Sequence, residues 1–459
     1  MSGLRTRGNF ARTLGGALCV LAFVSCERST KSSTRQGQSV PPAASASTAP
    51  APGAELAAPP VALSPDVKTA VEPHFVEPRD IPGDILAKFA KSHDVFAFEL
   101  YRKFAATQTE NNFVFSPISL QLALGMLVVG ARGGGENRLA RVAAPGMKPE
   151  RIYETMQSWQ EQLLRSMNGP VQPGVERVGV LKFENSLWLD DSVQPTSNFV
   201  EKVRQYFGFG VFRAPLHSPN GGASVINQWV SVQTDSRVTQ LLKTIPTTDN
   251  AVMLNGAYFK TKFASALGST EPEPFNSKAG SKSSVDMLRT MAKIRAVQTL
   301  TYQAVELDLV YGATSLVALM PMAGSLEAFA RGLTPAKWAQ ILVDLEHNKR
   351  TVDLHLPKSD VRSRFENLQA TVGLGSEPIA LPFVASSCQL TSLTQESTFV
   401  LNKDGIEVPS ATGTTMQSGS SAASKDDGSL VVRFDKPYVF AVIHRLTGAI
   451  VFLGHVVAP

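Results

Sequence analysis

The stretch that most restricts the fold is "SPISLQLALGMLVVG", residues 116–130. Ser116 is a good helix N-cap, Pro117 suits the first helical position, and the residues that follow are apolar almost all round until Gly130. A surface helix of a globular protein keeps one polar face. This stretch therefore predicts a helix that is surrounded on every side at the centre of a large folded unit.

The chain is long enough to build such a unit. It has 459 residues, of which 43% are hydrophobic and 18% charged, and it has no apolar run long enough to span a bilayer as a stable helix. From Ile81 onward there is no change in composition that indicates a domain boundary, and there is no internal repeat. We therefore predict a single domain over residues 81–459.

Helical and strand-like patterns are mixed along this domain. Residues 84–105 place Phe89, Phe96 and Leu100 on one helical face, with Asp84 as the expected cap, and residues 222–242 also read as helical. Strand-like runs gather towards the C-terminus, and they include "AVMLNGAYF", "SLVALMP", "TVDLHLP", "YVFAVIH" and "GAIVFLGHVV". Because the strands cluster and do not alternate regularly with helices, the pattern predicts an α+β fold with several sheets.

The N-terminus has the organisation of an export signal. Three arginines precede the short apolar run "LGGALCVLAFV", which predicts a signal peptide over residues 1–25. The following "FVSC" resembles a bacterial lipobox, so Cys26 is the expected lipidation site; ordinary cleavage or an uncleaved anchor are the alternatives. Residues 26–80 are rich in Ala, Pro and Ser, which predicts a disordered tether.

Charge and cysteine content exclude some classes of protein. The net charge of +5 includes the three signal arginines, which leaves about +2 for the mature chain and gives no preference for nucleic acid. Cys19 lies in the signal and Cys26 is the lipid candidate, so Cys388 alone remains in the body and no disulfide framework is expected. We expect Cys388 to be a small structural residue.

No pattern in the sequence indicates catalysis, a metal or a cofactor. We find no nucleophile elbow, zinc-binding helix motif, phosphate loop or carboxylate pair, and the glycines of "GARGGGEN" follow a predicted helix, which favours a turn. The histidines, among them His355, His444 and His455, are scattered, so core, edge or surface roles are expected. We therefore predict no catalytic residue, no cofactor and a protein that is not an enzyme.

A long segment of small polar residues, 402–429, interrupts the apolar patterns near the C-terminus. Either a linker or an exposed loop that serves as a bait would have this composition.

Six motifs in order resemble the serpins, the large serine-protease inhibitors that insert a loop into their own main sheet. The motifs are "NNFVFSPISLQLALGMLVVGARGG", "FENSLWL", "INQWVSVQTDSRVTQLL", "MLNGAYFKTKF", "VDLHLPK" and "FDKPYVFAVIHRLTGAIVFLGHVVAP", and the match runs from about Ile85 to Pro459. The resemblance implies the serpin fold: three β-sheets, eight or nine helices and an exposed reactive-centre loop, here at about residues 405–432.

The resemblance also implies site residues. Ser116, Ser119, Asn255 and Gln395 match a polar cluster under the main sheet, where Gln395 replaces a common His, and Phe263 replaces a common Trp at the top of that sheet. The hinge of the loop corresponds to Lys403, Asp404, Gly405, Ile406, Glu407, Val408, Pro409, Ser410, Ala411 and Thr412.

An inserted strand alternates its side chains between two faces. Ile406, Val408, Ser410 and Thr412 are expected to point into the core, and Glu407, Pro409 and Ala411 outward. Pro409 lacks a backbone donor. About a dozen new ladder bonds still outweigh the loss of roughly 1–3 kcal/mol for one donor, although insertion becomes slower.

Counts from the two ends of the loop disagree about the scissile bond. Counting forward from the hinge gives Gly419, with Ser420 after it, and counting back from "DKPY" gives Asp426. Within this window Met416 would suit a chymotrypsin-like or elastase-like protease, Ala422 and Ala423 an elastase-like one, and Lys425 a trypsin-like one.

These patterns together predict an exported, lipid-anchored bacterial serpin, a monomer that traps a serine or cysteine protease in the cell envelope or outside the cell. The alternative is a non-inhibitory serpin-fold binding protein whose loop is cleaved without trapping, and Pro409 and Ile406 are the residues that favour it.

Overall fold

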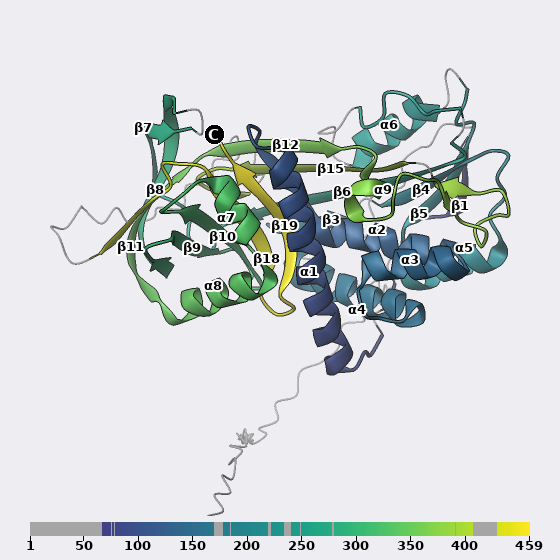
Figure 1. Ribbon diagram of the computed structural model, residues 1–459, viewed down its shortest axis with the longest axis horizontal. Helices are drawn as coiled ribbons and strands as arrows, with labels where there is room; N and C mark the ends of the chain where they lie inside the picture. Colours follow the sequence, from purple (N-terminus) through teal and green to yellow (C-terminus); the bar gives the residue numbers. More distant parts are fainter. Residues whose placement is uncertain are drawn as a thin grey trace, which may run out of the picture. The chain divides into compact units, whose positions relative to one another are not determined.

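The structure is a computed structural model, and it describes residues 67–74, 76–77, 79–168, 178–183, 185–218, 222–233, 240–247, 249–277, 280–390, 392–406 and 429–459. Within these residues the chain forms nine helices and three β-sheets (Figure 1). The expected α+β class, with three sheets and eight or nine helices, is therefore confirmed.

The main sheet has eight strands. Its order is β1-β5-β4-β6-β16-β15-β12, and β3 also pairs with β6. The strands are β1 (Lys68–Val71), β3 (Val180–Phe183), β4 (Ser186–Asp190), β5 (Gly210–Ala214), β6 (Ala251–Lys262), β12 (Ser359–Phe365), β15 (Ser392–Leu401) and β16 (Gly405–Ile406).

The second sheet has nine strands in the order β17-β11-β8-β9-β10-β18-β19-β2, with β7 paired to β8. These are β2 (Phe113–Phe115), β7 (Ser269–Asn276), β8 (Lys282–Gln298), β9 (Tyr302–Asp308), β10 (Thr314–Pro321), β11 (Lys349–Pro357), β17 (Leu430–Arg433), β18 (Tyr438–His444) and β19 (Ala449–Val456). Strands β13 (Ile379–Ala380) and β14 (Gln389–Leu390) form a separate pair.

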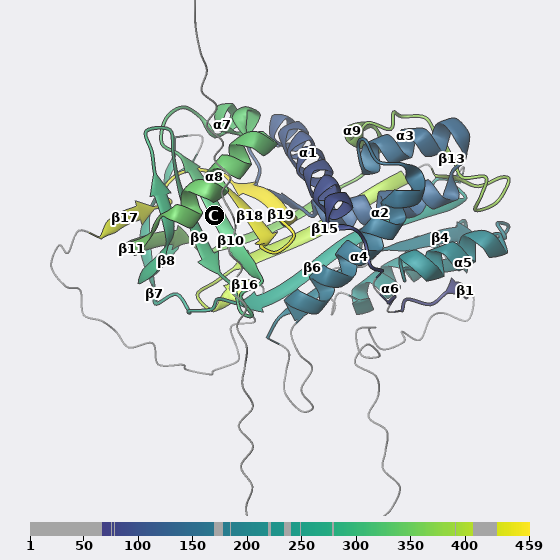
Figure 2. The ribbon, with the colours of Figure 1, turned by 90° about the horizontal axis from the view of Figure 1, so that it is seen from below.

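The helices lie on both faces of the main sheet. They are α1 (Gly83–Thr107), α2 (Pro117–Gly130), α3 (Gly133–Ala143), α4 (Pro149–Asn168), α5 (Ser197–Tyr206), α6 (Gly222–Gln233), α7 (Leu326–Gly332), α8 (Pro335–His347) and α9 (Leu368–Val372). Figure 1 shows α6 on one side of the main sheet and α2, α3 and α4 on the other. Helices α7 and α8 lie beside the second sheet, as Figure 2 also shows.

Alternation along the strands separates two apolar cores. On β4, Leu187 and Leu189 join the large core around α2, whereas Trp188 between them joins a smaller core with Trp229 of α6. On β6, Met253 faces α2 and its neighbours Val252 and Leu254 face α6. Because successive side chains of a strand point to opposite faces of the sheet, neighbouring residues of β4 and β6 pack into different cores.

Helix α2 is buried along its whole length. Every residue from Pro117 to Gly130 is buried, and the Ser116 side chain accepts a hydrogen bond from the Ser119 N–H at 3.3 Å. The predicted helix, its cap and its end are therefore confirmed. The cap expected for α1 is wrong: Pro82 occupies the N-cap position, and Asp84 lies inside the first helical turn, where a carboxylate favours the positive end of the helix dipole.

Residues ahead of α1 are part of the folded body. Strand β1 pairs antiparallel with β5, and Val71 is 1% exposed, although the composition of residues 26–80 predicts a tether. The physical reason is the free edge of β5, which offers unpaired backbone groups to any nearby strand. The predicted signal peptide, Cys26 and the tether up to residue 66 lie outside the described residues. Among the residues that were described, no helix combines the length and apolarity needed to cross a membrane.

Candidate functional site

The loop of small polar residues begins inside the main sheet. Strand β16 lies between β6 and β15, with Gly405 opposite Lys262, and with Ile406 opposite Thr261 on β6 and Leu401 on β15. Earlier in β15, from Ser392 to Ser397, this strand pairs directly with β6 in the parallel direction. The first two residues of the loop thus lie where the two central strands separate.

A tight turn leads the chain from β15 into β16. The Asn402 N–H donates to the Gly405 carbonyl at 3.0 Å, and the Asn402 side-chain oxygen accepts from the N–H groups of Asp404 at 2.9 Å and Gly405 at 3.2 Å. Such an Asx-type turn reverses the chain at low cost. Lys403 and Asp404 therefore form the tip of a hairpin.

The hairpin tip is held by the segment after β6. The Lys403 carbonyl accepts from the Leu267 N–H at 3.0 Å, and the Asp404 carbonyl accepts from the Phe263 N–H at 3.0 Å. Phe263 is 5% exposed and forms a bridge with Leu309. The aromatic residue expected at the top of the main sheet thus contacts the hinge directly.

Gly405 and Ile406 fit this position for steric and apolar reasons. A Cβ on Gly405 would lie 2.1 Å from the Thr261 carbonyl oxygen, so only glycine permits this approach. The Ile406 side chain is 1% exposed and belongs to the large core. Burial of an isoleucine stabilises a site by about 1.5–3 kcal/mol, which favours the seated hinge.

Polar side chains meet beneath the separating strands. The Asn255 amide donates to Ser119 Oγ at 2.9 Å and to Asn185 Oδ1, and Ser119 Oγ donates to the Gly256 carbonyl at 2.7 Å. Ser119, Asn185 and Asn255 are 0–2% exposed. The sequence interpretation did not select Asn185, although it is a polar residue directly before the apolar strand in "FENSLWL".

Gln395 extends this cluster to β15. Its amide donates to the Ser116 carbonyl at 2.9 Å and to Asn255 Oδ1, and its oxygen accepts from the Ser116 N–H at 3.2 Å. Gln395 and Asn255 are opposite each other in the parallel register of β15 and β6. The Gln395–Asn255 contact therefore links β15 and β6 within the stretch where these two strands pair directly with each other.

The other end of the loop enters the second sheet. Ser429 precedes β17, which pairs parallel with β11 from Leu430 to Arg433. Arg433 Nη1 donates to Glu273 of β7 at 2.5 Å, and the Arg433 carbonyl accepts from Gln303 Nε2 at 2.6 Å. The two ends of the loop are thus fixed in different sheets.

Several predicted site residues fall between these ends. Residues 407–428 lie outside the described residues, and they include the hinge positions Glu407, Val408, Pro409, Ser410, Ala411 and Thr412 and the scissile-bond candidates Met416, Gly419, Ser420, Ala422, Ala423, Lys425 and Asp426.

The histidines of the described body have structural partners, and its free cysteine, Cys388, is buried. His355 Nδ1 lies 2.6 Å from Glu273, His444 Nε2 lies 2.7 Å from Ser166 Oγ, and His455 Nε2 lies 3.1 Å from the Asn111 carbonyl. Burial raises the pKa of the Cys388 thiol to about 12, which keeps it protonated and unreactive. No group of three or more metal-ligating side chains occurs in the part of the chain that the structure describes.

Comparison with known proteins agrees with this architecture. A family model described as Serpin (serine protease inhibitor) matches residues 91–459. Bovine Serpin A3-3 is 23% identical over 393 residues, which cover 83% of this chain and 91% of the relative. Human thyroxine-binding globulin is 23% identical over 396 residues, which cover 82% of this chain and 91% of the relative.

Solved structures of similar fold include the thermophilic serpin tengpin in its native state. It aligns with a TM-score of 0.70 at 19% identity, over 85% of this chain and 98% of that chain. Thyroxine-binding globulin in complex with thyroxine aligns with a TM-score of 0.68 at 21% identity, over 81% of this chain and 99% of that chain. At these identities the likeness concerns the fold. Because the family model covers far more than half of its length, the chain belongs to the serpin family.

Proposed function

We propose that this protein inhibits a serine-type endopeptidase, or a cysteine protease, as a suicide substrate. The observation that carries the proposal is β16, whose two residues lie between β6 and β15 in the opening through which a new strand would enter. A protease that cleaves the loop would form an acyl-enzyme. Insertion of the freed segment would carry the protease along on its acyl bond, so that its oxyanion hole would no longer be aligned to complete hydrolysis.

The pairing of β16 predicts which residues the rest of the loop would contact if it were inserted. Continued in the same pairing, Val408 would face Phe259 and Phe399, and Thr412 would face Asn255 and Gln395. The Gln395–Asn255 contact must break when the strands part, and the Thr412 hydroxyl would replace it with new hydrogen bonds. An inward hydroxyl at this position therefore fits the polar cluster.

Trapping is tested with elastase, chymotrypsin and trypsin on denaturing gels, and mass spectrometry of the cut site would identify the scissile bond. A complex that survives denaturant is the expected result. The matched pair is Val408→Arg, which would bring a charge between two buried phenylalanines, and Glu407→Arg, which would remain on the outward face. We expect V408R to be cleaved without trapping and E407R to trap.

If both variants and the unaltered protein are cleaved and release the protease equally, the inhibitor proposal fails. A protease whose catalytic serine is replaced by alanine is the control, because it cannot form the acyl bond and should give no stable complex.

A binding protein is the second candidate. Thyroxine-binding globulin is among the similar proteins, and an open hollow of about 600 Å³ lies between α6 and residues 240–247, lined by His217, Asn227 and Lys243 among others. Calorimetry with thyroxine as the probe tests it. Micromolar binding together with cleavage that gives no trapping would favour this function.

The proposal also covers export, the oligomeric state and attachment to the membrane. We infer an exported monomer without a cofactor, with residues 1–25 as the signal peptide and Cys26 as the lipid-bearing residue. Metabolic labelling with a palmitate analogue should mark the unaltered protein, whereas C26S should stay unlabelled.

A further inference from the structure

The described chain enters the main sheet at one end of its strands. On β1, Lys68 lies opposite Arg213 of β5, and Arg213 lies opposite Leu189 of β4. Leu189 in turn lies opposite Ala251, the first residue of β6. Strands β1 and β6 run in the same direction, because each is antiparallel to one of the parallel strands β5 and β4. The chain ahead of Lys68 therefore leaves the sheet beyond the beginning of β6.

The hinge of the loop lies at the other end of the same strands. Ile406 is opposite Thr261, next to the last residue of β6. The levels of Ala251 and Thr261 are ten residues apart on β6, which corresponds to about 33 Å along the strand. The three strand spacings from β1 to β6 add about 14 Å across the sheet. Nearly the full length of the main sheet thus separates the chain entry from the hinge.

The other end of the loop also lies away from the chain entry. Strand β17, which follows the loop, and strand β1 are at opposite ends of the view in both Figure 1 and Figure 2. Both strands belong to one compact unit, residues 52–459. The loop is therefore fixed at both ends to the part of this unit that is remote from β1.

Several contacts fix the chain entry to the folded body. Val71 is 1% exposed and packs in the large core, and Lys68 Nζ lies 3.4 Å from Asp191. A few residues later, the His74 N–H donates to the Gly208 carbonyl at 2.9 Å. An anchor on the chain ahead of Lys68 would therefore hold the body by the edge of its main sheet.

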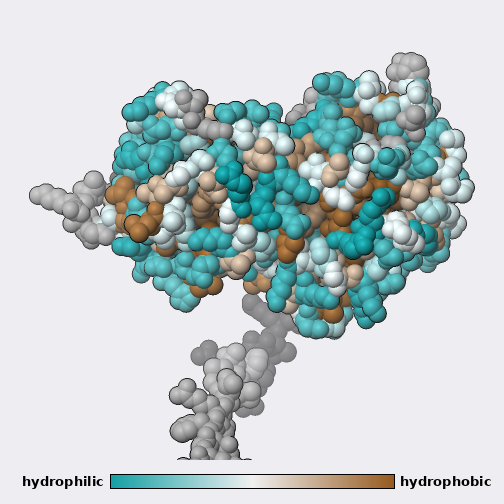
Figure 3. All heavy atoms as spheres, in the orientation of Figure 1, coloured by the Kyte–Doolittle hydropathy of each residue, from teal (hydrophilic) through white to brown (hydrophobic). Residues whose placement is uncertain are grey.

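The surface of the body was searched for a face that would lie on a bilayer. On the face seen in Figure 3, hydrophilic side chains separate the apolar areas from one another. That face has no continuous apolar surface that would bind it flat against lipid. Attachment through the chain entry would thus decide the orientation of this face.

We propose that the anchored protein turns its chain entry towards the membrane and its loop towards the solution, so that the partner it meets is a soluble endopeptidase. This inference rests on the proposed function and on the proposed lipid at Cys26. The proposed tether, residues 27–66, has 40 residues, for which a flexible chain has an r.m.s. length of roughly 35 Å or more. The ~33 Å along the main sheet adds to the distance between the bilayer and the loop.

The test couples the mature chain, residues 26–459, to lipid vesicles through the Cys26 thiol and a maleimide lipid. Cys388 does not compete, because it is buried and burial raises its pKa to about 12. Soluble elastase, chymotrypsin or trypsin is added, whichever cuts the loop of the free protein, and denaturing gels follow the cleavage. We expect the rate on vesicles to stay within about twofold of the rate for the same protein coupled to a soluble maleimide.

A second attachment reverses the body. The variant C26S/V431C places the thiol on β17 beside the loop, where Val431 is 52% exposed. We expect its attachment to vesicles to slow loop cleavage about fivefold or more, relative to the same variant with a soluble maleimide. The reason is steric, since a protease of about 230 residues has a radius of gyration of ~17 Å and does not fit between this end of the body and the bilayer.

A shortened tether separates the effect of the body from that of the tether. Deletion of residues 30–59 leaves ten of the 40 tether residues, 27–29 and 60–66. Cleavage of the Cys26-coupled protein should stay within about twofold, because the length of the main sheet still separates the entry from the hinge. The proposal is overturned if attachment through Cys26 slows cleavage as much as attachment of V431C, if V431C is cleaved equally fast on vesicles and in solution, or if the deletion slows cleavage fivefold.

These rates do not depend on trapping. A loop that is cut without trapping would refute the inhibitor proposal, and the comparison of cleavage rates would still decide the orientation. A free protein whose loop none of the three proteases cuts would refute both.

Discussion

At the scale of single residues, Gly405 decides whether the hinge can lie in the sheet. We predict that G405A displaces β16, because the added Cβ would lie 2.1 Å from the Thr261 carbonyl oxygen. Exchange of the Gly405 and Ile406 amides should become faster, and the free energy of unfolding should fall by about 1–3 kcal/mol. G134A is the control, since nothing lies within 4 Å of its Cβ. Unchanged exchange in G405A would contradict the seated hinge.

Two buried histidines make the protein sensitive to acid. Burial lowers the pKa of His93 and of His444 to about 4, and hydrogen bonds to His93 only partly oppose this. Between about pH 6.5 and 4 the unfolded chain binds protons that the folded chain does not, so stability falls as pH falls through this window. H444Q should reduce the loss by up to ~1.4 kcal/mol per pH unit in urea titrations at pH 4.5 and 6.5. An unchanged loss would count against the buried imidazole.

Features that depend on adjacent residues could be predicted from the sequence, whereas contacts between distant segments could not. Ser116 and Pro117 were recognisable because a helix cap depends on adjacent residues. The role of Asn185 was not, because its partners Ser119 and Asn255 come from distant segments. The fit of Gly405 likewise depends on how closely β6 approaches it.

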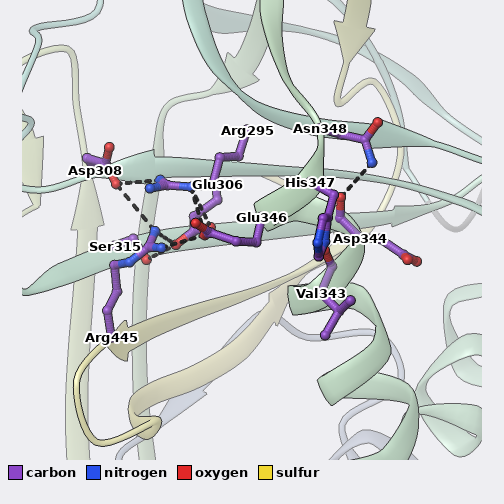
Figure 4. A network of polar contacts seen from close by, with 10 residues as sticks. All are labelled: Arg295, Glu306, Asp308, Ser315, Val343, Asp344, Glu346, His347, Asn348 and Arg445. Atoms are coloured by element: carbon purple, nitrogen blue, oxygen red, sulfur yellow. Dashed lines mark hydrogen bonds and ion pairs between the residues drawn. The ribbon is translucent and has the colours of Figure 1, made fainter. Parts of the chain in front are cut away.

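At the scale of elements, one ionic network joins β8, β9, α8 and the turn between β18 and β19 (Figure 4). Glu306 is 4% exposed and accepts from Ser315 Oγ and Arg445 Nη1, both at 2.6 Å. Arg295 pairs with Asp308 at 2.8 Å, and Arg445 also reaches Glu346 at 2.7 Å. A buried carboxylate that loses a partner is costly.

We therefore predict that R445M lowers the free energy of unfolding by about 2–4 kcal/mol. The control is R362M, since Arg362 and Asp360 pair at 3.3 Å with side chains 63% and 55% exposed, and such surface pairs contribute ~0–1 kcal/mol. Chemical denaturation of both variants gives the comparison. Equal losses would show that the network adds nothing beyond a surface pair.

Element prediction succeeded where the apolar pattern was long. Helix α2 and the strand pair β18–β19 have continuous apolar sequences, and both are buried as expected. Strand β1 has four residues, "KTAV", with no pattern of its own. Its formation depends on the open edge of β5, which the local sequence does not reveal.

At the scale of the whole molecule, the proposed insertion changes stability. After a cut in the loop, about a dozen new ladder hydrogen bonds at about 0.5–1.5 kcal/mol each would stabilise the protein by roughly 6–18 kcal/mol. We predict a rise in melting temperature of about 10 °C or more on calorimetry of the cleaved protein. Cleaved V408R should show no such rise. A cleaved protein that melts at the original temperature would refute insertion.

The anchoring of the loop in two sheets has a practical consequence. A cut between residues 406 and 429 would divide the polypeptide, but the C-terminal piece would carry β18 and β19, whose residues are all buried and pair with β10 and β2. The two fragments would behave as one particle in gel filtration and separate only in denaturant. Co-expression of the two fragments should thus be able to reconstitute the protein.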